Sequence, residues 1–403
     1  MTTLSETIDL QRQFVLPTYS PELVLARGAM SRVWDQTGRE YLDFTSGISV
    51  CNLGHCHPRV TEAIQRQAAT LVHVSNLFYN QLQPRLARVV SQLAFGGRVF
   101  FCNSGAEANE GIIKFARRWG GGSGRCRIVC MENSFHGRTL ATLAATGRAK
   151  YRMGFQPDTP GFVHVPFNSI KAAEQALDSS TAAVLVEPIL GEGGVIPANV
   201  EYLRQLRRLC DDRGILLLFD EVQCGMGRSG EMFAFQHYGV EPDGMTLAKA
   251  LGNGFPIGAF VVREQWADIF EPGTHASTFG GNPLACAAGL AVFETFEQDN
   301  VLDHARRMSG LLRAGLDELG RRHTLIEEVR GVGMMLGIDL RTPVKPVLQG
   351  AAKAGLLILS AGENTLRLLP PLTVGETEVD DALSILDQVL SAAGAQTNGD
   401  GQS

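Results

Sequence analysis

The pattern of apolar and polar positions alternates between two periods along most of the chain. Short, continuous apolar runs alternate with longer segments in which apolar residues recur every three or four positions. The runs are typical of strands buried on both faces, and the longer segments of helices that cover a sheet. The runs predict strands at 98–102, 127–130, 182–186, 215–219, 245–248 and 257–262. The periodic segments predict helices at 58–72, 83–94, 106–119 and 200–213.

The pattern changes towards both ends of the chain. After about residue 283 the sequence predicts long helices, then short strands and a last helix, at 283–298, 301–320, 334–339, 356–360, 365–369 and 376–392. Near the N-terminus it predicts irregular chain and a small hairpin, whose strands at 32–36 and 40–44 flank the turn Thr37-Gly38. Alternating strands and helices predict an α/β fold: a large domain with a mostly parallel sheet flanked by helices, plus a smaller α+β domain.

These changes divide the chain into four predicted parts. Residues 1–53 form an N-terminal segment that joins the small domain, 54–283 the large domain and 284–392 the C-terminal small domain. Residues 393–403 are small and polar, which predicts a disordered tail.

Composition narrows the class of protein. Of 403 residues, 44% are hydrophobic and 19% charged, which is enough apolar sequence for a sizeable core. The net charge of −6, without a run of Lys or Arg, argues against a nucleic-acid partner. There is no apolar run long enough to span a membrane, and the first residues lack a signal-peptide pattern. We expect a cytoplasmic protein.

The eight cysteines are dispersed and mostly flanked by apolar residues. This distribution predicts reduced, core-packed thiols rather than a disulfide framework. Two sequences suggest a metal site at first sight: His55-Cys56-His57, and the pair Cys126 and Cys130. Neither has a second ligand pair at zinc-site spacing, so no metal is expected.

Lys249 is the residue with the clearest chemical meaning. It lies in an apolar stretch that runs into glycines, and none of the other five lysines falls between residues 172 and 344. Burial disfavours an ammonium ion, so a lysine in such surroundings is pushed towards its neutral, nucleophilic form. This raises the possibility of a Schiff base with pyridoxal phosphate. The alternative is a loop lysine whose charged end reaches solvent.

Asp220 ends the apolar strand 215–219, where the carboxyl ends of parallel strands border a ligand crevice. A carboxylate there can keep a pyridine nitrogen protonated, and the Gln223 amide could reach the ring's phenolic oxygen. The alternative for Asp220 is a residue that simply starts a turn. Glycines at 225–230 match a dinucleotide-binding motif, but five residues separate them from the strand and no convincing helix follows, so we reject that reading.

Three further positions could contact a flat, phosphorylated ligand. Ser104 can cap the helix after the strand 98–102, whose first N–H groups would then suit a phosphate. Phe135 could stack on a ring and Arg138 could bind a carboxylate. Thr278, in a polar, glycine-rich segment, could add a hydroxyl to the phosphate. An ordinary cap, a core aromatic, a surface arginine and a plain loop threonine remain the alternatives.

Together these pieces carry a family resemblance. The chain resembles the class III, fold-type I, pyridoxal-phosphate-dependent aminotransferases, and within them the acetylornithine and succinylornithine group, from about Leu16 to Leu390. The motifs that carry it stand at 53–58, 103–109, 135–138, 187–194, 219–228 and 248–252.

The resemblance implies roles for the cofactor site. Lys249 binds the cofactor covalently and then moves a proton between substrate and cofactor, and Asp220 pairs with the pyridine nitrogen. Gln223 meets the phenolic oxygen and Phe135 stacks on the ring. The phosphate is held by Ser104, Gly105, Ala106 and Thr278. In this family the threonine comes from the other subunit, which implies a homodimer with active sites at the interface.

The resemblance also implies how two substrates share one site. Arg138 holds the carboxylate far from the cofactor, Arg367 takes the second carboxylate of glutamate, and Glu192 pairs with Arg367 when that carboxylate is absent. Ser277 is expected beside the substrate. Ile48 stands where ornithine aminotransferases carry a tyrosine, and an apolar wall suits an acylated amine.

The resemblance thus implies transfer of the terminal amino group of N-acetylornithine to 2-oxoglutarate. The products are N-acetylglutamate 5-semialdehyde and glutamate, a step of arginine biosynthesis. Succinylornithine, ornithine or 4-aminobutyrate as substrate, and a non-catalytic cofactor-binding protein, remain the alternatives. Leu190 departs from the family pattern, in which relatives often have Gln.

Overall fold

The computed structural model describes residues 3–399, with side chains to residue 395, and its centre is a seven-stranded sheet. The strands run in the order β4 (Arg98–Cys102), β12 (Gly258–Val262), β11 (Gly244–Leu247), β10 (Leu216–Asp220), β7 (Thr181–Val186), β5 (Arg127–Met131) and β6 (Phe162–Val165). β12 is antiparallel to both its neighbours, and the other recorded pairings are parallel. The prediction of a mostly parallel sheet is confirmed.

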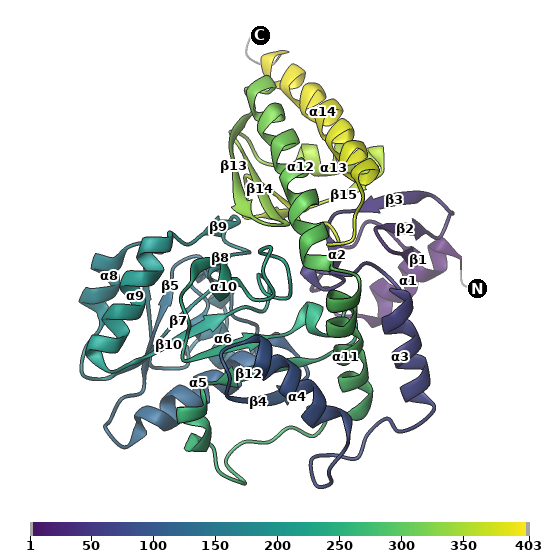
Figure 1. Cartoon of the computed structure of the whole chain (residues 1–403). Coiled ribbons are helices and arrows are strands. Elements are labelled where there is room, and N and C mark those ends of the chain that lie inside the picture. The colour runs from purple at the N-terminus through teal and green to yellow at the C-terminus, as the bar shows by residue number, and fades with distance from the viewer. Residues whose placement is uncertain (1–2, 400–403) are drawn as a thin grey trace.

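Helices cover both faces of this sheet (Figure 1). α5 (Gly105–Gly121) packs on β11 and β12, and α9 (Val200–Arg213) on β10. α8 (Ile170–Ala176) lies beside α9. α11 (Pro283–Gln298) packs on α3 (Pro58–Ala68) and α4 (Leu82–Leu93). Every residue of β7 and β10 is buried, which explains their continuous apolar sequences.

The second part of the fold is a four-stranded antiparallel sheet with three helices, at the top of Figure 1. Its strands run in the order β13 (Ile326–Val332), β14 (Met335–Leu340), β17 (Thr365–Leu368) and β16 (Leu359–Ala361). Its helices are α12 (Val301–Arg322), α13 (Lys345–Ala354) and α14 (Glu376–Gly399). This confirms the predicted smaller α+β part.

The N-terminal strands form a separate sheet that a C-terminal strand completes. The predicted hairpin is present as β2 (Arg32–Asp35) and β3 (Glu40–Asp43), with β1 (Leu25–Ala29) beside it. β15 (Leu356–Leu357) pairs in parallel with β3, with Leu356 opposite Leu42. The N-terminal segment is therefore hydrogen-bonded to the C-terminal part of the chain. The domain boundaries at 53/54 and 283/284 stay predictions.

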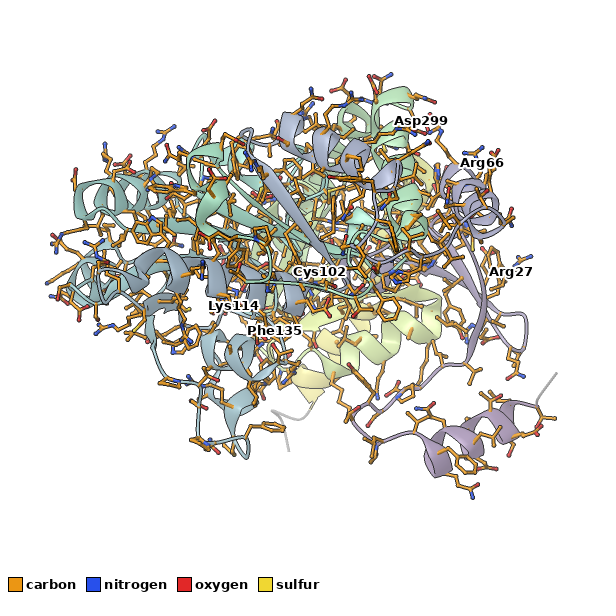
Figure 2. The ribbon with its side chains drawn as sticks, turned by 90° about the horizontal axis from the view of Figure 1, so that it is seen from below. Arg27, Arg66, Cys102, Lys114, Phe135 and Asp299 are labelled. Atoms are coloured by element: carbon orange, nitrogen blue, oxygen red, sulfur yellow. The ribbon has the colours of Figure 1, made fainter. Side chains whose placement is uncertain are left out.

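The N-terminal chain is less irregular than predicted. α1 (Leu4–Phe14) is a helix with a capping box, in which Thr3 and Glu6 bond each other's backbone N–H groups. It has no buried residue and lies apart from the body of the molecule, as Figure 2 shows. The signal for it was the local T-x-x-E pattern at its start.

The predicted disordered tail is wrong for residues 393–399. α14 continues to Gly399, past the predicted end at 392. Alanines at 392, 393 and 395 explain this extension, because alanine is the strongest helix former and outweighs the small, polar composition that suggested disorder. Residues 400–403, the rest of the predicted tail, lie outside the described residues.

Several short elements complete the chain and were not predicted. They are α2 (Ser46–Ser49), α6 (Leu140–Ala145), α7 (Ala149–Arg152), β8 (Ile189–Leu190), β9 (Ile196–Pro197), α10 (Ala234–Tyr238) and the 3-10 helices η1 (Lys249–Leu251) and η2 (Glu264–Ile269). Within residues 3–399, no helix is both long and apolar enough to cross a membrane. All eight cysteines are free thiols, although Cys56 and Cys126 are exposed rather than core-packed.

Candidate active site

A cavity of about 430 Å³ opens where the parallel strands of the large sheet end. The segments that follow β4, β5, β7, β10 and β11 all contribute to its wall. Eight of the predicted site residues line it: Ser104, Gly105, Ala106, Phe135, Arg138, Asp220, Gln223 and Lys249. The folding of one sheet thus brings together residues spread over about a third of the chain.

Lys249 stands one residue after β11, behind Ala248, and begins the short helix η1. Its φ of 48° lies in the left-handed region, which costs a non-glycine residue about 1–2 kcal/mol. Burial, and after it the charge of Arg367, lower the pKa of its amine to about 8, against the opposing charges of Glu192, Asp220 and Glu187. Within residues 3–399 no carboxylate lies in ion-pairing distance of Lys249 Nζ, so the amine is available for chemistry.

Asp220 is a buried carboxylate with several hydrogen-bond donors. His136 Nδ1 and Asn109 Nδ2 each lie 2.7 Å from its Oδ2. The Val222 backbone N–H donates to Oδ1 at 3.0 Å, and the Thr246 hydroxyl lies 3.4 Å from the same oxygen. These bonds fix the orientation of the carboxylate at the cavity wall.

The residues that hold Asp220 were missed by sequence reasoning. Asn109 also donates to the backbone carbonyl of His136 and accepts from Thr246, so the three residues form one buried network. His136 Nε2 is buried, and it has no hydrogen-bond partner among residues 3–399. Asn109 and His136 stand inside the motifs that carry the family resemblance, which is the only sequence signal for them.

Glu187, which follows β7, is a second buried carboxylate at the cavity wall and was also missed. It accepts hydrogen bonds from the backbone N–H groups of Phe135, at 2.8 Å, and Gly191, at 3.2 Å. Burial raises its pKa to about 7, with His136 opposing and Asp220 reinforcing this shift. Through its two hydrogen bonds, Glu187 joins the loop of Phe135 to the β8–β9 hairpin.

The start of α5 forms the end of the cavity that suits a phosphate. Ser104 caps the helix by accepting a hydrogen bond from the Glu107 N–H at 3.1 Å. Gly105 has no room for a side chain, because a Cβ there would lie 2.7 Å from Val222 Cγ1. The free N–H groups of the first turn, with the helix dipole, favour an anion.

Arg138 lies in the exposed loop that follows Phe135. Its guanidinium carbon stands 4.1 Å from the centre of the Tyr151 ring and 5.4 Å from that of Phe135. No carboxylate within residues 3–399 pairs with it. An arginine stacked on an aromatic ring keeps its N–H edge free for a ligand carboxylate.

Arg367 is buried and paired, in contrast to Arg138. Its Nη1 donates to Glu192 Oε1 at 2.6 Å and to Gln223 Oε1 at 2.9 Å. Gln223 lines the cavity, so this pair stands directly behind its wall. Leu190, in β8 two residues before Glu192, is fully buried, and nothing in the structure explains its departure from the family pattern.

The remaining predicted residues lie outside the cavity wall. Ile48 is 41% exposed, on α2. Ser277 Oγ accepts a hydrogen bond from Asn103, a wall residue, at 3.4 Å. Thr278, next to it, is exposed in the loop before α11.

Comparison with known proteins places this arrangement in a family. The model of the class III aminotransferases matches residues 17–390. The chain belongs to this family. It is 50% identical to the acetylornithine aminotransferase of Caldanaerobacter subterraneus subsp. tengcongensis, over 95% of this chain and 99% of that one. It is 48% identical to that of Methanocaldococcus jannaschii, over 95% and 98%.

Solved structures agree on the fold. The ornithine aminotransferase of Toxoplasma gondii ME49 superposes with a TM-score of 0.94 at 32% identity, covering 98% of this chain and 97% of that one. The acetylornithine aminotransferase of Elizabethkingia anophelis gives 0.86 at 33% identity, covering 97% and 100%.

The chain is therefore a pyridoxal-phosphate-dependent aminotransferase. Its residues fit that cofactor. The buried carboxylate of Asp220, at the cavity wall, suits a hydrogen-bond donor such as a pyridinium N–H, and the amine of Lys249 has no ion pair within residues 3–399. The start of α5 offers N–H groups to the phosphate.

Proposed function

We propose that this enzyme transfers the terminal amino group of N-acetylornithine to 2-oxoglutarate, giving N-acetylglutamate 5-semialdehyde and glutamate. The observation that carries the proposal is the difference between the two arginines. Arg138 has no carboxylate partner within residues 3–399, whereas Arg367 is paired with Glu192, with 2.6 Å between Nη1 and Oε1. This suits a site that takes a substrate with one carboxylate and, in the other half-reaction, a substrate with two. The relatives named above support the same substrate, and with it a role in arginine biosynthesis.

The cofactor, when bound, supplies an electron sink that stabilises negative charge on the substrate carbon. Lys249 is the residue we expect to bind it and then to carry the proton at that carbon. Asp220 would hold the pyridine nitrogen protonated, and Gln223, at the cavity wall, would orient the phenolic oxygen. Phe135 would stack on the ring, and Ser104, Gly105 and Ala106 would hold the phosphate. A lowered pKa lets Lys249 release its proton near neutral pH.

The two arginines act in different half-reactions. N-acetylornithine reacts through its terminal amine, so its carboxylate lies far from the cofactor, where Arg138 can bind it. Glutamate reacts through its α-amine, so Arg138 binds the side-chain carboxylate and the α-carboxylate needs a second cation. Arg367 becomes available to it when Glu192 swings away. Arg367 then exchanges the Glu192 carboxylate for that of the substrate, so its buried charge is paired in both states.

Two residues at the rim support an acylated substrate. Ile48 offers an apolar side chain where a tyrosine would offer a hydroxyl, and a neutral acylated amine costs less to bury against it than an ammonium does. Ser277 would add a hydroxyl near the substrate, and its contact with Asn103, a residue of the cavity wall, supports that role.

We further propose a homodimer with active sites at its interface, in the cytoplasm. Exposed apolar side chains gather in two loops, with Leu77 at 85%, Phe78 at 70% and Phe279 at 58% exposure. Asn76 joins these loops by donating to the carbonyls of Ser277 and Gly280, at 3.1 and 2.9 Å. Large exposed apolar patches mark protein interfaces. Thr278 lies within this patch, where it can reach the phosphate site of a partner subunit.

The experiment is a single half-reaction with the purified, cofactor-loaded protein. N-acetylornithine is added without an oxo-acid, and the visible spectrum reports whether the cofactor passes from its aldehyde to its amine form. Conversion supports the proposal. Conversion only with succinylornithine, ornithine or 4-aminobutyrate would replace the proposed substrate, and a bound cofactor that no amine converts would indicate a non-catalytic binding protein.

A further inference from the structure

A continuous series of contacts joins the two arginines of the site. The guanidinium of Arg138 lies 4.1 Å from the centre of the Tyr151 ring. Arg148 Nη1 donates to Tyr151 Oη at 3.3 Å and to the backbone carbonyl of Glu192 at 2.7 Å. Glu192 in turn accepts from Arg367 at 2.6 Å. Arg148 therefore contacts both Tyr151, on which Arg138 stacks, and Glu192, which pairs with Arg367.

Arg148 is placed for this role by local structure. It directly precedes α7, the short helix that carries Tyr151, and is half-buried. Glu192 lies in the loop between β8 and β9. Within residues 3–399 no carboxylate pairs with Arg148, so its charge strengthens the hydrogen bond to the Glu192 carbonyl instead. Hydrogen bonds from a charged donor are shorter and stronger than neutral ones.

The loop that carries Glu192 is held at three points. Gly191 donates its N–H to Glu187 at 3.2 Å, and the carbonyl of Gly194 accepts from Arg330 Nε at 2.9 Å. Between these two contacts, Arg148 donates a hydrogen bond to the backbone carbonyl of Glu192 itself. The position of the Glu192 carboxylate therefore depends on Arg148 more directly than on the other two contacts.

We propose that Arg148 is a positioning residue that sets the balance between closed and open states of Glu192 over Arg367. Through Tyr151 it also couples that balance to the carboxylate bound at Arg138. This inference rests on the proposed function, in which the two arginines bind the substrate carboxylates.

Electrostatics agree with the geometry. Burial works against ionisation of Glu192, but the charge and hydrogen bond of Arg367 and the charges of Lys249 and Arg148 outweigh it, so its pKa lies below the ordinary value. Arg148 thus stabilises the ionised carboxylate that closes over Arg367. Its removal weakens the closed state and leaves Arg367 free more often.

The consequence is a shift in preference between the half-reactions. A donor with one carboxylate and a terminal amine uses the closed state, in which the charge of Arg367 is neutralised. Glutamate and 2-oxoglutarate need the open state. Loss of Arg148 therefore disfavours the first kind of substrate relative to the second.

The test compares Arg148→Met and Arg148→Lys with the matched control Lys150→Met. Lys150 is an exposed cation 5.5 Å from the same Tyr151 ring, with no recorded bond to Glu192. The kcat/KM values of single half-reactions are measured with N-acetylornithine and with glutamate. Arg148→Met should lower the kcat/KM for N-acetylornithine, divided by that for glutamate, about five- to tenfold. This is the range of typical coupling between two sites. Arg148→Lys should recover part of the loss, and Lys150→Met should keep the native ratio.

A binding measurement removes the dependence on turnover. Glutarate carries two carboxylates and no amine, so its affinity reports how readily Glu192 moves away from Arg367. Calorimetry on the cofactor-loaded protein should show tighter glutarate binding in Arg148→Met than in the native enzyme. If N-acetylornithine proves not to be the donor, the same ratio is measured with 4-aminobutyrate. Equal slowing of both half-reactions with unchanged glutarate affinity would overturn the inference.

Discussion

Lys249 occupies an environment that costs the folded protein stability. Its backbone is left-handed and its pKa is lowered by burial from 10.5 to about 8. Below pH 8 the amine is protonated in both folded and unfolded chains, so the folded state carries the full cost of a buried charge. Between pH 8 and 10.5 only the unfolded chain holds the proton, so this cost disappears as pH rises.

Replacing Lys249 by Met should therefore stabilise the cofactor-free protein at pH 7, by about 3 kcal/mol for a shift of this size. The gain should shrink towards pH 10, and turnover of the loaded protein should fall roughly 10³-fold or more, since a proton-transfer group is lost. Denaturant unfolding at both pH values measures the first effect. Lys171→Met, at an exposed lysine of α8, is the control. A variant less stable than the native chain at pH 7 would contradict the burial cost.

Arg138→Ala should raise the KM of both substrates, because both place a carboxylate on this residue. A lost hydrogen bond to a charged group is worth about 1.5–3 kcal/mol, or roughly 10- to 150-fold in KM. Steady-state kinetics with each substrate varied in turn provide the measurement. Arg208→Ala, at an exposed ion pair with Glu201 on α9, should change neither value. An effect confined to one substrate would refute the shared site.

At this scale the sequence was informative where residue type alone carries chemistry. An isolated lysine, a strand-end carboxylate and a loop arginine drew attention to Lys249, Asp220 and Arg138, and the family resemblance then gave each a predicted role. His136 and Asn109 were not predicted, since they lie 84 and 111 residues from Asp220 along the chain and gain their role only by contact with it.

At the scale of elements, α2 is the most strained part of the site. Gly47 and Ile48 have φ values of 60° and 66°, in a region that a β-branched residue rarely adopts. Two buried serine hydroxyls hold the turn in place. Ser46 donates to the carbonyl of Leu369 at 2.7 Å, and Ser49 to that of Gln223 at 3.1 Å. The Ile48 side chain is thereby fixed relative to the cavity.

Ile48→Tyr should shift preference from N-acetylornithine towards free ornithine. The added hydroxyl gives the ornithine ammonium a polar contact, and the ratio of the two kcat/KM values should move about tenfold, as expected for one net hydrogen bond. Ile48→Phe adds the ring without the hydroxyl and is the matched control. Equal effects of the two substitutions would show that bulk, rather than the hydroxyl, decides the preference.

The elements differ in how far sequence could predict them. β4 and α9 have the predicted bounds, because their apolar patterns are strong and their ends carry clear signals. β6 was missed because only one of its residues is buried, so its sequence has no continuous apolar run. α1 was missed because it packs on nothing and depends on its cap alone.

At the scale of the whole molecule, the exposed apolar patch around Thr278 is the surface that the proposed homodimer would bury. Phe78→Asp combined with Tyr79→Asp should yield monomers that lose pyridoxal phosphate more readily, because charges in an apolar interface are strongly unfavourable. Light scattering measures the mass, and absorbance after gel filtration measures the retained cofactor. Leu311→Asp, at an isolated exposed leucine of α12, is the control. A dimer that survives the double change would place the interface elsewhere.

The pairing of β3 with β15 has a consequence for synthesis on the ribosome. β3 leaves the ribosome early, but β15 lies about 300 residues further along the chain. At about 5–20 residues per second, the open edge of β3 waits roughly 15–60 s for its partner. Throughout that interval the nascent chain presents an unpaired strand edge, the kind of surface that recruits other chains. We therefore expect that protecting this edge during translation raises the share of newly made protein that reaches its native form.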